Sequence, residues 1–228
     1  MPSAQVRHAV LVHGAGGGGW EWGTWRRVLE AHGVECACID LVPTDAGLAA
    51  TCFDDYQAQL RTVLEALPRP RALIGASLGG LLAAACAGGA DALVLVNPLP
   101  PSPLSARLER REWPDVVPWR RDARLASTRA ALADADDATA LFAFRRWRDE
   151  SGRVLRQAQS GVAVDVPACR VLLVASELDE DVPADVTAEL AGAWGASLMR
   201  LPGSTHVGPL LGREAADVAS QVVAWLRA

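Results

Sequence analysis

A serine between two glycines is the strongest chemical signal in the chain, in the motif Gly75-Ala-Ser-Leu-Gly79. A serine hydroxyl is a weak nucleophile, and a sharp turn from a strand into a helix aims it out of the backbone toward a base. The apolar run before the motif and the alanine-rich run after it predict such a turn. The pattern therefore predicts Ser77 as a nucleophile. The simpler alternative is that Ser77 only caps the following helix.

A serine nucleophile needs a histidine to accept its proton. The chain has four histidines, and His206 lies in a loop after the last predicted strand and before the last predicted helix. That is the edge of an open α/β sheet at which sites are usually built. His8, near the chain start, and His32, near a helix end, are poorer candidates. We predict His206 as the base.

The histidine in turn needs a buried carboxylate that holds its tautomer. The loop after the fifth predicted strand offers four acids, Glu177, Asp179, Glu180 and Asp181. Asp179 is our first choice and Asp181 the second, because spacing alone does not decide between them.

A glycine-rich loop, His13 to Gly19, follows the first predicted strand. A tetrahedral intermediate carries an oxyanion that needs two backbone donors. We expect these to be the N–H of Leu78, after the nucleophile, and the N–H of Ala15 in this loop. A nucleotide-phosphate loop is the rival interpretation, since the segment partly matches G-x-G-x-x-G. That interpretation leaves the serine, aspartate and histidine positions unexplained.

The elements that must position these groups alternate along the chain. Strands are predicted at 8–13, 34–40, 71–76, 92–96, 170–175 and 197–201, and helices at 20–31, 54–67, 78–87, 185–194 and 214–226. Continuous apolar strands between amphipathic helices indicate a parallel sheet that is covered on both faces. The fold class is therefore α/β, with about six mostly parallel strands and helices on both faces.

One long insertion interrupts the alternation. Residues 1–98 and 167–228 are predicted to form the core, and residues 99–166, which show no strand pattern, a helical lid. Twelve of the 22 arginines lie between Arg107 and Arg156, against nine acids. The segment from Arg107 to Arg156 thus carries a local charge of +3, and the rest of the chain −8. These arginines are either a solvated face or a basic rim that attracts an acidic substrate or an acyl carrier.

Aromatic side chains recur within this arginine-rich segment. Trp113, Phe144 and Trp147 are predicted to turn inward and bind substrate, together with Gly14 and Trp20 beside the first strand. The alternative is that the lid aromatics only pack the lid onto the core.

Composition excludes several classes of protein. With 228 residues, 50% apolar and 21% charged, the chain can bury a sizeable core. A net charge of −5 argues against nucleic-acid binding, and no apolar run is long enough for a membrane span. The first residues show no export leader, so we expect a cytoplasmic protein.

The chain contains no lysine at all. That excludes Schiff-base chemistry, pyridoxal phosphate enzymes and the Walker A phosphate loop. The histidines and cysteines show no paired ligand spacing, so no metal or other cofactor is expected.

On these motifs the chain resembles the α/β-hydrolase superfamily, and within it the family of small methylesterases and hydroxynitrile lyases. The residues that carry the resemblance are His13–Trp22, Phe53–Tyr56, Leu64–Pro68, Gly75–Gly80, Glu177–Asp179 and Thr205–His206. They cover the sheet scaffold but not the lid. The resemblance implies an α/β-hydrolase fold, a triad of Ser77, Asp179 and His206, and oxyanion donors from Ala15 and Leu78.

Departures from the family pattern narrow the expected activity. The lyases carry a lysine after the histidine and a threonine in the glycine loop, where this chain has Val207 and Gly14. Cyanohydrin cleavage is therefore not expected. The resemblance implies a serine hydrolase acting on a small carboxylic ester or thioester through an acyl-enzyme. The alternative is a non-hydrolytic use of the fold, as a ligand-binding protein or a cyclase or lyase in a biosynthetic pathway.

Overall fold

Six strands pair in parallel into one sheet, in the order β2-β1-β3-β4-β7-β8. The fold comes from a computed structural model that describes residues 5–228. The strands are β1 His8–Val12, β2 Glu35–Ile39, β3 Arg71–Ala76, β4 Ala92–Val96, β7 Arg170–Ser176 and β8 Ser197–Leu201. The predicted six-stranded parallel sheet is confirmed. The expectation of no export leader rests partly on residues 1–4, which lie outside the described residues.

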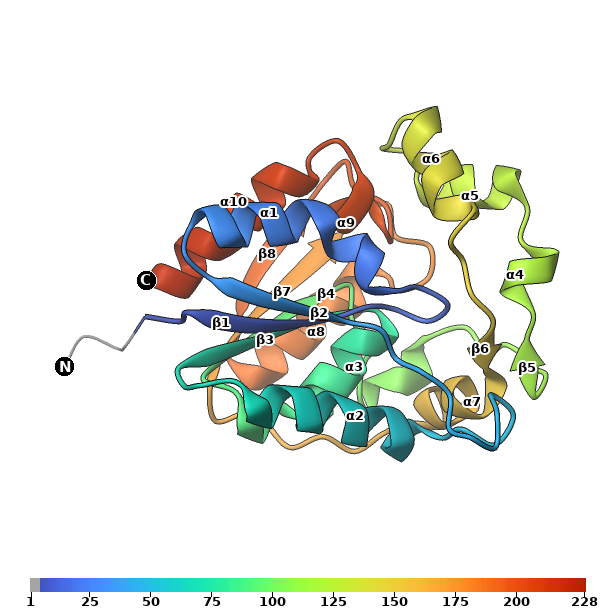
Figure 1. The fold of residues 1–228 in the computed structure, drawn as a ribbon, viewed down its shortest axis with the longest axis horizontal. Coiled ribbons are helices and arrows are strands. Elements are labelled where there is room, and N and C mark those ends of the chain that lie inside the picture. The colour runs from blue at the N-terminus through green and yellow to red at the C-terminus, as the bar shows by residue number, and fades with distance from the viewer. Residues whose placement is uncertain (1–4) are drawn as a thin grey trace.

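Helices cover both faces of the sheet, which is why the central strands are apolar throughout (Figure 1). One face packs against α1 and α10, and the other against α2, α3 and α8. These helices and the three short ones beside them are η1 Gly19–Trp22, α1 Gly23–Ala31, α2 Phe53–Ala66, α3 Leu78–Ala85, η2 Ala87–Gly89, α8 Ala184–Trp194, α9 Gly208–Leu211 and α10 Ala215–Arg227. No helix within residues 5–228 is long and apolar enough to cross a lipid bilayer.

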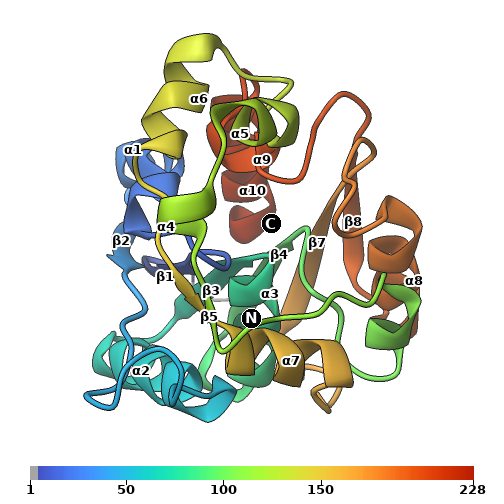
Figure 2. The same ribbon diagram turned by 90° about the vertical axis from the view of Figure 1, so that its right-hand side faces the viewer.

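The insertion is largely helical and lies beyond the carboxyl ends of the strands (Figures 1 and 2). Its elements are η3 Leu104–Arg107, β5 Val116–Val117, α4 Trp119–Asp122, α5 Leu125–Ala131, α6 Asp137–Phe144, β6 Glu150–Ser151 and α7 Gly152–Ser160. The expectation that it holds no strand is wrong, because β5 and β6 pair antiparallel, with Val117 opposite Glu150. Two-residue strands whose partners are far apart in the sequence leave no alternating pattern to detect.

The insertion has two parts with different packing. Val154, Leu155 and Ala158 of α7 are buried in the same apolar cluster as α2 and α3. The α5–α6 part adds no side chain to that cluster and lies on the side of α1 and α9 (Figure 2). The last helix of the insertion thus packs as part of the scaffold.

The start of α3 packs directly on the end of β1. A Cβ at Gly79 would overlap the carbonyl oxygens of Val12 and His13, and one at Gly75 would overlap the carbonyl of Gly79. These two glycines let the turn after β3 approach the loop after β1 more closely than any side chain permits. The approach brings together the two segments that carry Ser77 and the glycine loop.

We predict that Gly79→Ala destabilises the protein by about 1–3 kcal/mol, because backbone atoms cannot move aside as side chains do. Gly192→Ala in α8 is the matched control, since a Cβ there meets nothing within 4 Å. Relief of glycine's entropy cost in a helix should make that control about 0.5–1 kcal/mol more stable. Chemical denaturation measures both changes. Equal stability of the two variants contradicts the proposed close packing.

Candidate active site

Ser77 lies at the turn between β3 and α3 in a conformation that few non-glycine residues adopt. Its φ is +53° and its ψ −120°, and its side chain makes no cap hydrogen bond with the helix. The alternative that Ser77 only caps α3 is therefore wrong. A positive φ costs free energy in a residue that has a side chain. Close packing at the neighbouring glycines holds the backbone of Ser77 in this conformation. The turn presents the Ser77 hydroxyl to the cavity above the sheet.

Ser77 and His206 come together from turns that are far apart in the sequence. Nε2 of His206 lies 2.9 Å from Oγ of Ser77, and its Nδ1 lies 2.7 Å from Oδ2 of Asp179. The remaining oxygen of Asp179, Oδ1, accepts the N–H groups of Asp181 and Val182 at 2.8 and 2.9 Å. Asp179 is thus a buried carboxylate with both oxygens engaged, and it orients the imidazole toward the serine.

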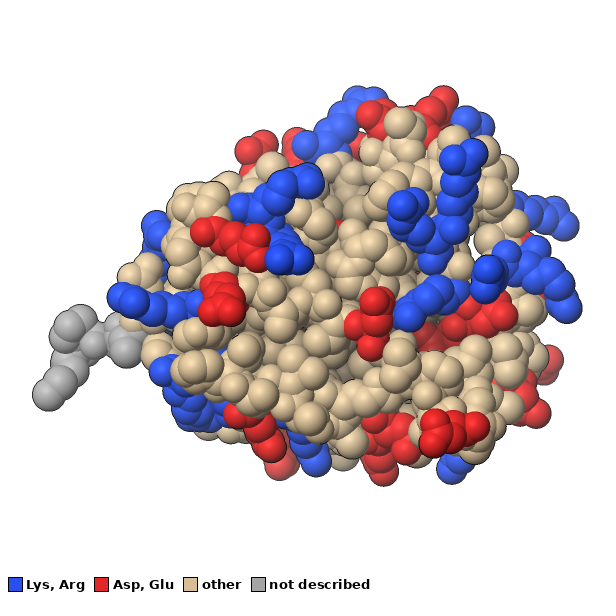
Figure 3. Space-filling view, in the orientation of Figure 1, with Lys and Arg blue, Asp and Glu red and all other residues tan. Residues whose placement is uncertain are grey.

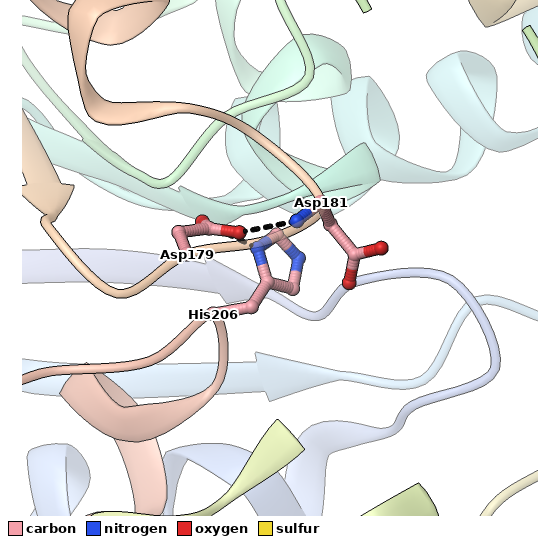
Figure 4. Close-up of side chains that lie close together, drawn as sticks. All are labelled: Asp179, Asp181 and His206. Atoms are coloured by element: carbon pink, nitrogen blue, oxygen red, sulfur yellow. Dashed lines mark hydrogen bonds and ion pairs between the residues drawn. The ribbon is translucent and has the colours of Figure 1, made fainter. Parts of the chain in front are cut away.

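The structure distinguishes the two aspartates that the sequence offers as partners of His206 (Figure 4). The carboxylate of Asp179 faces the ring of His206, whereas that of Asp181 is exposed and pairs with Arg111 at 2.9 Å. Asp179, Asp181 and His206 are close enough together to suggest a metal site. Hydrogen bonds and the Arg111 ion pair already account for all three side chains.

The surroundings of His206 favour its protonated form. Burial by itself lowers the pKa of His206, but the hydrogen bond and charge of Asp179 outweigh burial. The charge of Asp181 acts in the same direction, so the pKa is raised from its ordinary value of 6.5. A base with a raised pKa takes a proton from serine more readily, provided that the solution pH leaves it neutral.

Two backbone N–H groups flank Ser77 without partners of their own. Leu78 begins α3, where an N–H has no intrahelical acceptor, and Ala15 lies in the cavity wall. Neither N–H has a hydrogen-bond partner within residues 5–228. Both are therefore free to donate to an oxygen that develops negative charge beside Ser77.

His13 holds the glycine loop as a neutral side chain. Its Nδ1 donates to the carbonyl of Gly14 at 2.7 Å, and its Nε2 accepts the N–H of Leu41 at 3.0 Å. Burial, with a smaller contribution from the nearby charge of Arg148, lowers the pKa of His13 to about 4. A neutral imidazole with one donor and one acceptor nitrogen satisfies both backbone groups, which a charged one cannot do.

The returning segment of the insertion clamps the same loop. The N–H of Arg148 donates to the carbonyl of Gly16 at 2.8 Å, and its Nε donates to the carbonyl of Gly17 at 2.6 Å. Oε2 of Glu150 accepts the N–H of Gly16 at 2.9 Å, and its Oε1 accepts the Tyr56 hydroxyl at 2.7 Å. Glu150 is thus a buried carboxylate that ties the insertion and α2 to the residue next to Ala15.

The His206 loop is held from two sides. The side-chain amide of Asn97, which has a φ of +43°, donates to the carbonyl of His206 at 2.8 Å and to the Ser176 hydroxyl at 2.9 Å. On the other side the hydroxyls of Ser204 and Thr205 lie 3.1 and 2.8 Å from the carboxylate of Asp134, between α5 and α6. The insertion therefore supports both the glycine loop and the histidine loop.

A cavity of about 480 Å³ opens between the sheet end and the insertion. Of the residues predicted to bind substrate, Gly14, Trp113 and Trp147 line it, whereas Trp20 and Phe144 do not. Trp20 instead packs edge-on against Phe142 and Trp147, with ring centroids 5.6 and 5.4 Å apart. Trp113 and Trp147 thus lie where the prediction of substrate binding places them. Trp20 instead packs against the insertion.

Glu21 is a cavity residue that the sequence prediction missed. It lines the cavity on the side of the glycine loop. The acid lies among glycines and tryptophans, and no local pattern marked it. Trp119, another aromatic of the insertion, also lines the cavity and packs on Gly16, where a Cβ would leave its ring no room.

The arginines of the insertion divide into two equal groups. Six of the twelve form ion pairs with nearby acids, among them Arg107 with Asp185 and Glu189 of α8. The other six have no ion-pair partner in the described part of the chain. Figure 3 shows basic side chains gathered on the side where Figure 1 places the insertion. The cavity mouth itself mixes signs, with Arg111 and Arg124 beside Glu109, Glu180 and Asp181.

Comparisons with known proteins show which family and which proteins this chain is similar to. Residues 9–221 match the model of a family described as "Alpha/beta hydrolase family". Methylesterase 18 of Arabidopsis thaliana is 39% identical over 88 residues, which are 35% of this chain and 33% of that protein. Norfluorocurarine synthase 1 of Strychnos sp is 37% identical over 84 residues, or 33% of this chain and 31% of that protein. The matched parts thus span about a third of each of these relatives.

The structural similarity covers more of the chain than the sequence similarity does. The crystal structure of the methylesterase protein MES16 from Arabidopsis superposes with a TM-score of 0.73 and covers 96% of this chain and 99% of that one. Its identity of 16% makes this a likeness of fold alone.

We predict that Tyr56→Phe destabilises the protein by about 1.5–3 kcal/mol, because the buried Glu150 carboxylate loses a hydrogen-bond donor. Thr62→Ala in the same helix is the control, since that exposed hydroxyl bonds only to the carbonyl of Ala58. It should shift the free energy of unfolding by no more than about 0.5 kcal/mol. Urea titration compares the variants. A Tyr56→Phe variant as stable as the control contradicts the role given to the clamp.

Proposed function

The chain belongs to the alpha/beta hydrolase family, and from that premise we propose that it is a serine esterase that cleaves a small carboxylic ester through an acyl-enzyme. One observation carries the proposal. Ser77, His206 and Asp179 form an unbroken chain of hydrogen bonds at the base of a cavity, beside two N–H groups without partners. Relatives with methylesterase names support the same activity.

In the proposed mechanism Oγ of Ser77 attacks the ester carbonyl while Nε2 of His206 accepts the serine proton. Asp179 keeps the imidazole in the tautomer with hydrogen on Nδ1 and stabilises the imidazolium. The N–H groups of Ala15 and Leu78 donate to the oxyanion. His206 then protonates the leaving alcohol, and a water molecule activated by the same histidine releases the acid from Ser77.

The cavity supports a small, largely apolar substrate. Its volume is within the range of sites for drug-sized molecules, and three tryptophans, Trp113, Trp119 and Trp147, line it. Residues 99–166 act in this proposal as a lid whose aromatics contact the acyl or alcohol group. Thioesters fit the same chemistry, and the six unpaired arginines of the insertion would suit an acidic acyl carrier. A cytoplasmic location stays a prediction.

A non-hydrolytic role is the second candidate. Matched relatives include norfluorocurarine synthases, whose names describe synthases and not esterases. Catalytic turnover separates the two roles, because an esterase releases acid repeatedly and a binding protein does not.

Ser77→Ala should lower kcat for activated esters by at least about 10³-fold and leave the fold intact, because the change removes one small hydroxyl. Hydrolysis of nitrophenyl esters of increasing acyl length measures the loss, and circular dichroism checks the fold. Ser220→Ala, at an exposed hydroxyl of α10, is the control and should keep full activity. Wild-type rates in Ser77→Ala overturn the covalent mechanism.

Asp179→Asn should lower kcat about 10⁴-fold by favouring the wrong histidine tautomer, whereas Asp181→Asn should cost far less. The pH profile gives a second readout. Activity needs neutral His206, and its raised pKa places the acid limb of kcat/KM above pH 6.5. Loss of the Asp179 charge lowers that pKa, so residual activity in Asp179→Asn should extend to lower pH. Reversed effects of the two substitutions mean that Asp181 is the partner of His206.

A further inference from the structure

Glu21 is a buried acid in the wall of the cavity that holds Ser77 and His206. It lies in η1, directly after the glycine loop, and is only 4% exposed. The proposed mechanism gives it no role. It forms no ion pair within residues 5–228, in contrast to Glu150, the other buried glutamate, which accepts three hydrogen bonds.

The glycine loop makes room for the Glu21 carboxyl group. A Cβ at Gly17 would overlap Oε1 of Glu21, so the carboxyl group occupies the space that a side chain at this position would take. Gly14 adjoins both groups: its backbone N–H is directed to the Glu21 carboxyl group, and a Cβ on it would lie 3.1 Å from Cβ of Ser77. Glu21, Gly14, Ala15 and Ser77 all line the same cavity.

The charges that face Glu21 do not keep it ionised. Burial is the largest influence on the pKa of Glu21 and raises it. The N–H groups of Gly14 and Gly18 and the charges of His206 and Arg148 lower it in part, and the pKa that results is about 8. The guanidinium of Arg148 is itself bonded to the carbonyl of Gly17 and to Nε2 of His13. At neutral pH the side chain is thus a carboxylic acid, with one O–H to donate.

We propose that Glu21 is a third oxyanion donor, whose protonated carboxyl group donates a hydrogen bond to the ester carbonyl oxygen as that oxygen gains negative charge. The inference rests on the proposed esterase function.

The step balances without any further reactant. When Oγ of Ser77 bonds to the carbonyl carbon, the π electrons move onto the oxygen and the serine proton moves to His206. Glu21 shares its proton with that oxygen and keeps it. When the intermediate collapses, the electrons return to the carbonyl, and the leaving alkoxide takes the proton from His206.

The proposal makes ionisation of Glu21 inhibitory. A carboxylate at this place has no proton to donate, and its negative charge repels the oxyanion. Activity should therefore rise with pH as His206 becomes neutral and fall again above about pH 8, as Glu21 loses its proton.

The test compares kcat/KM for one nitrophenyl ester from pH 6 to 10 in the wild type, Glu21→Gln and Glu21→Leu. Glutamine keeps an N–H donor and has no proton to lose. It should reduce activity at pH 7 less than about tenfold and abolish the alkaline fall. Leucine has no donor, and loss of one oxyanion donor should cost about 10²–10³-fold at pH 7. Glu35→Gln on β2, with a side chain that is 80% exposed, is the matched control and should keep the wild-type profile.

A second measurement needs no turnover. Between about pH 4.5 and 8 the folded protein holds a proton on Glu21 that the unfolded chain has released. The stability of the wild type should therefore fall relative to that of Glu21→Gln as pH rises through this window, and level off above it.

Three results overturn the inference: Glu21→Leu within threefold of the wild type at pH 7, an alkaline fall that persists in Glu21→Gln, or no alkaline fall in the wild type. In each case an active wild type and an inactive Ser77→Ala leave the esterase proposal standing. If Ser77→Ala is as active as the wild type, the esterase proposal and this inference both fail.

Discussion

The absence of side chains at Gly75 and Gly79 is the constraint on which the rest of the site depends. Because α3 starts against the backbone carbonyls at the end of β1, the turn of Ser77 and the glycine loop meet at van der Waals distance. A Cβ on Gly14 would lie 3.1 Å from Cβ of Ser77, so the glycine loop passes close beside the nucleophile that we propose. The N–H groups of Ala15 in this loop and of Leu78 after the serine have no hydrogen-bond partner within residues 5–228. Close packing of the neighbouring residues holds the backbone of Ser77 at its strained, positive φ.

Hydrogen bonds of buried polar groups fix the loops of the site in one conformation. His13 stays neutral so that it can serve two backbone groups, and Asn97 links the ends of β4 and β7 to the His206 loop. Two buried glutamates have opposite surroundings. Three donors surround Glu150, which holds the loop in place, whereas burial without an ion pair favours the neutral form of Glu21. The insertion donates and accepts hydrogen bonds at both loops, so its packing supports the geometry of the site.

Sequence reasoning was accurate wherever the determining contacts are local. The bounds of β3 and β4 agree with the predicted ones, because apolar runs between glycine or proline breaks mark buried strands. The bounds of β8, an edge strand that is largely exposed, also agree. The choice between Asp179 and Asp181 needed coordinates, since the two residues share one loop and differ in which of them faces His206. The insertion was harder. β5 and β6 pair across 32 intervening residues. Trp20 packs against Phe142 and Trp147 instead of lining the cavity, a contact that no periodicity encodes.

The central claim is that His206 and Asp179 make Ser77 the reactive nucleophile of the chain. The most direct test is labelling of the intact protein with a fluorophosphonate, followed by mass spectrometry of its peptides. The account predicts one modified residue, Ser77, and labelling that slows strongly when His206 is replaced by alanine. An unlabelled protein, or a label on any other residue, contradicts it.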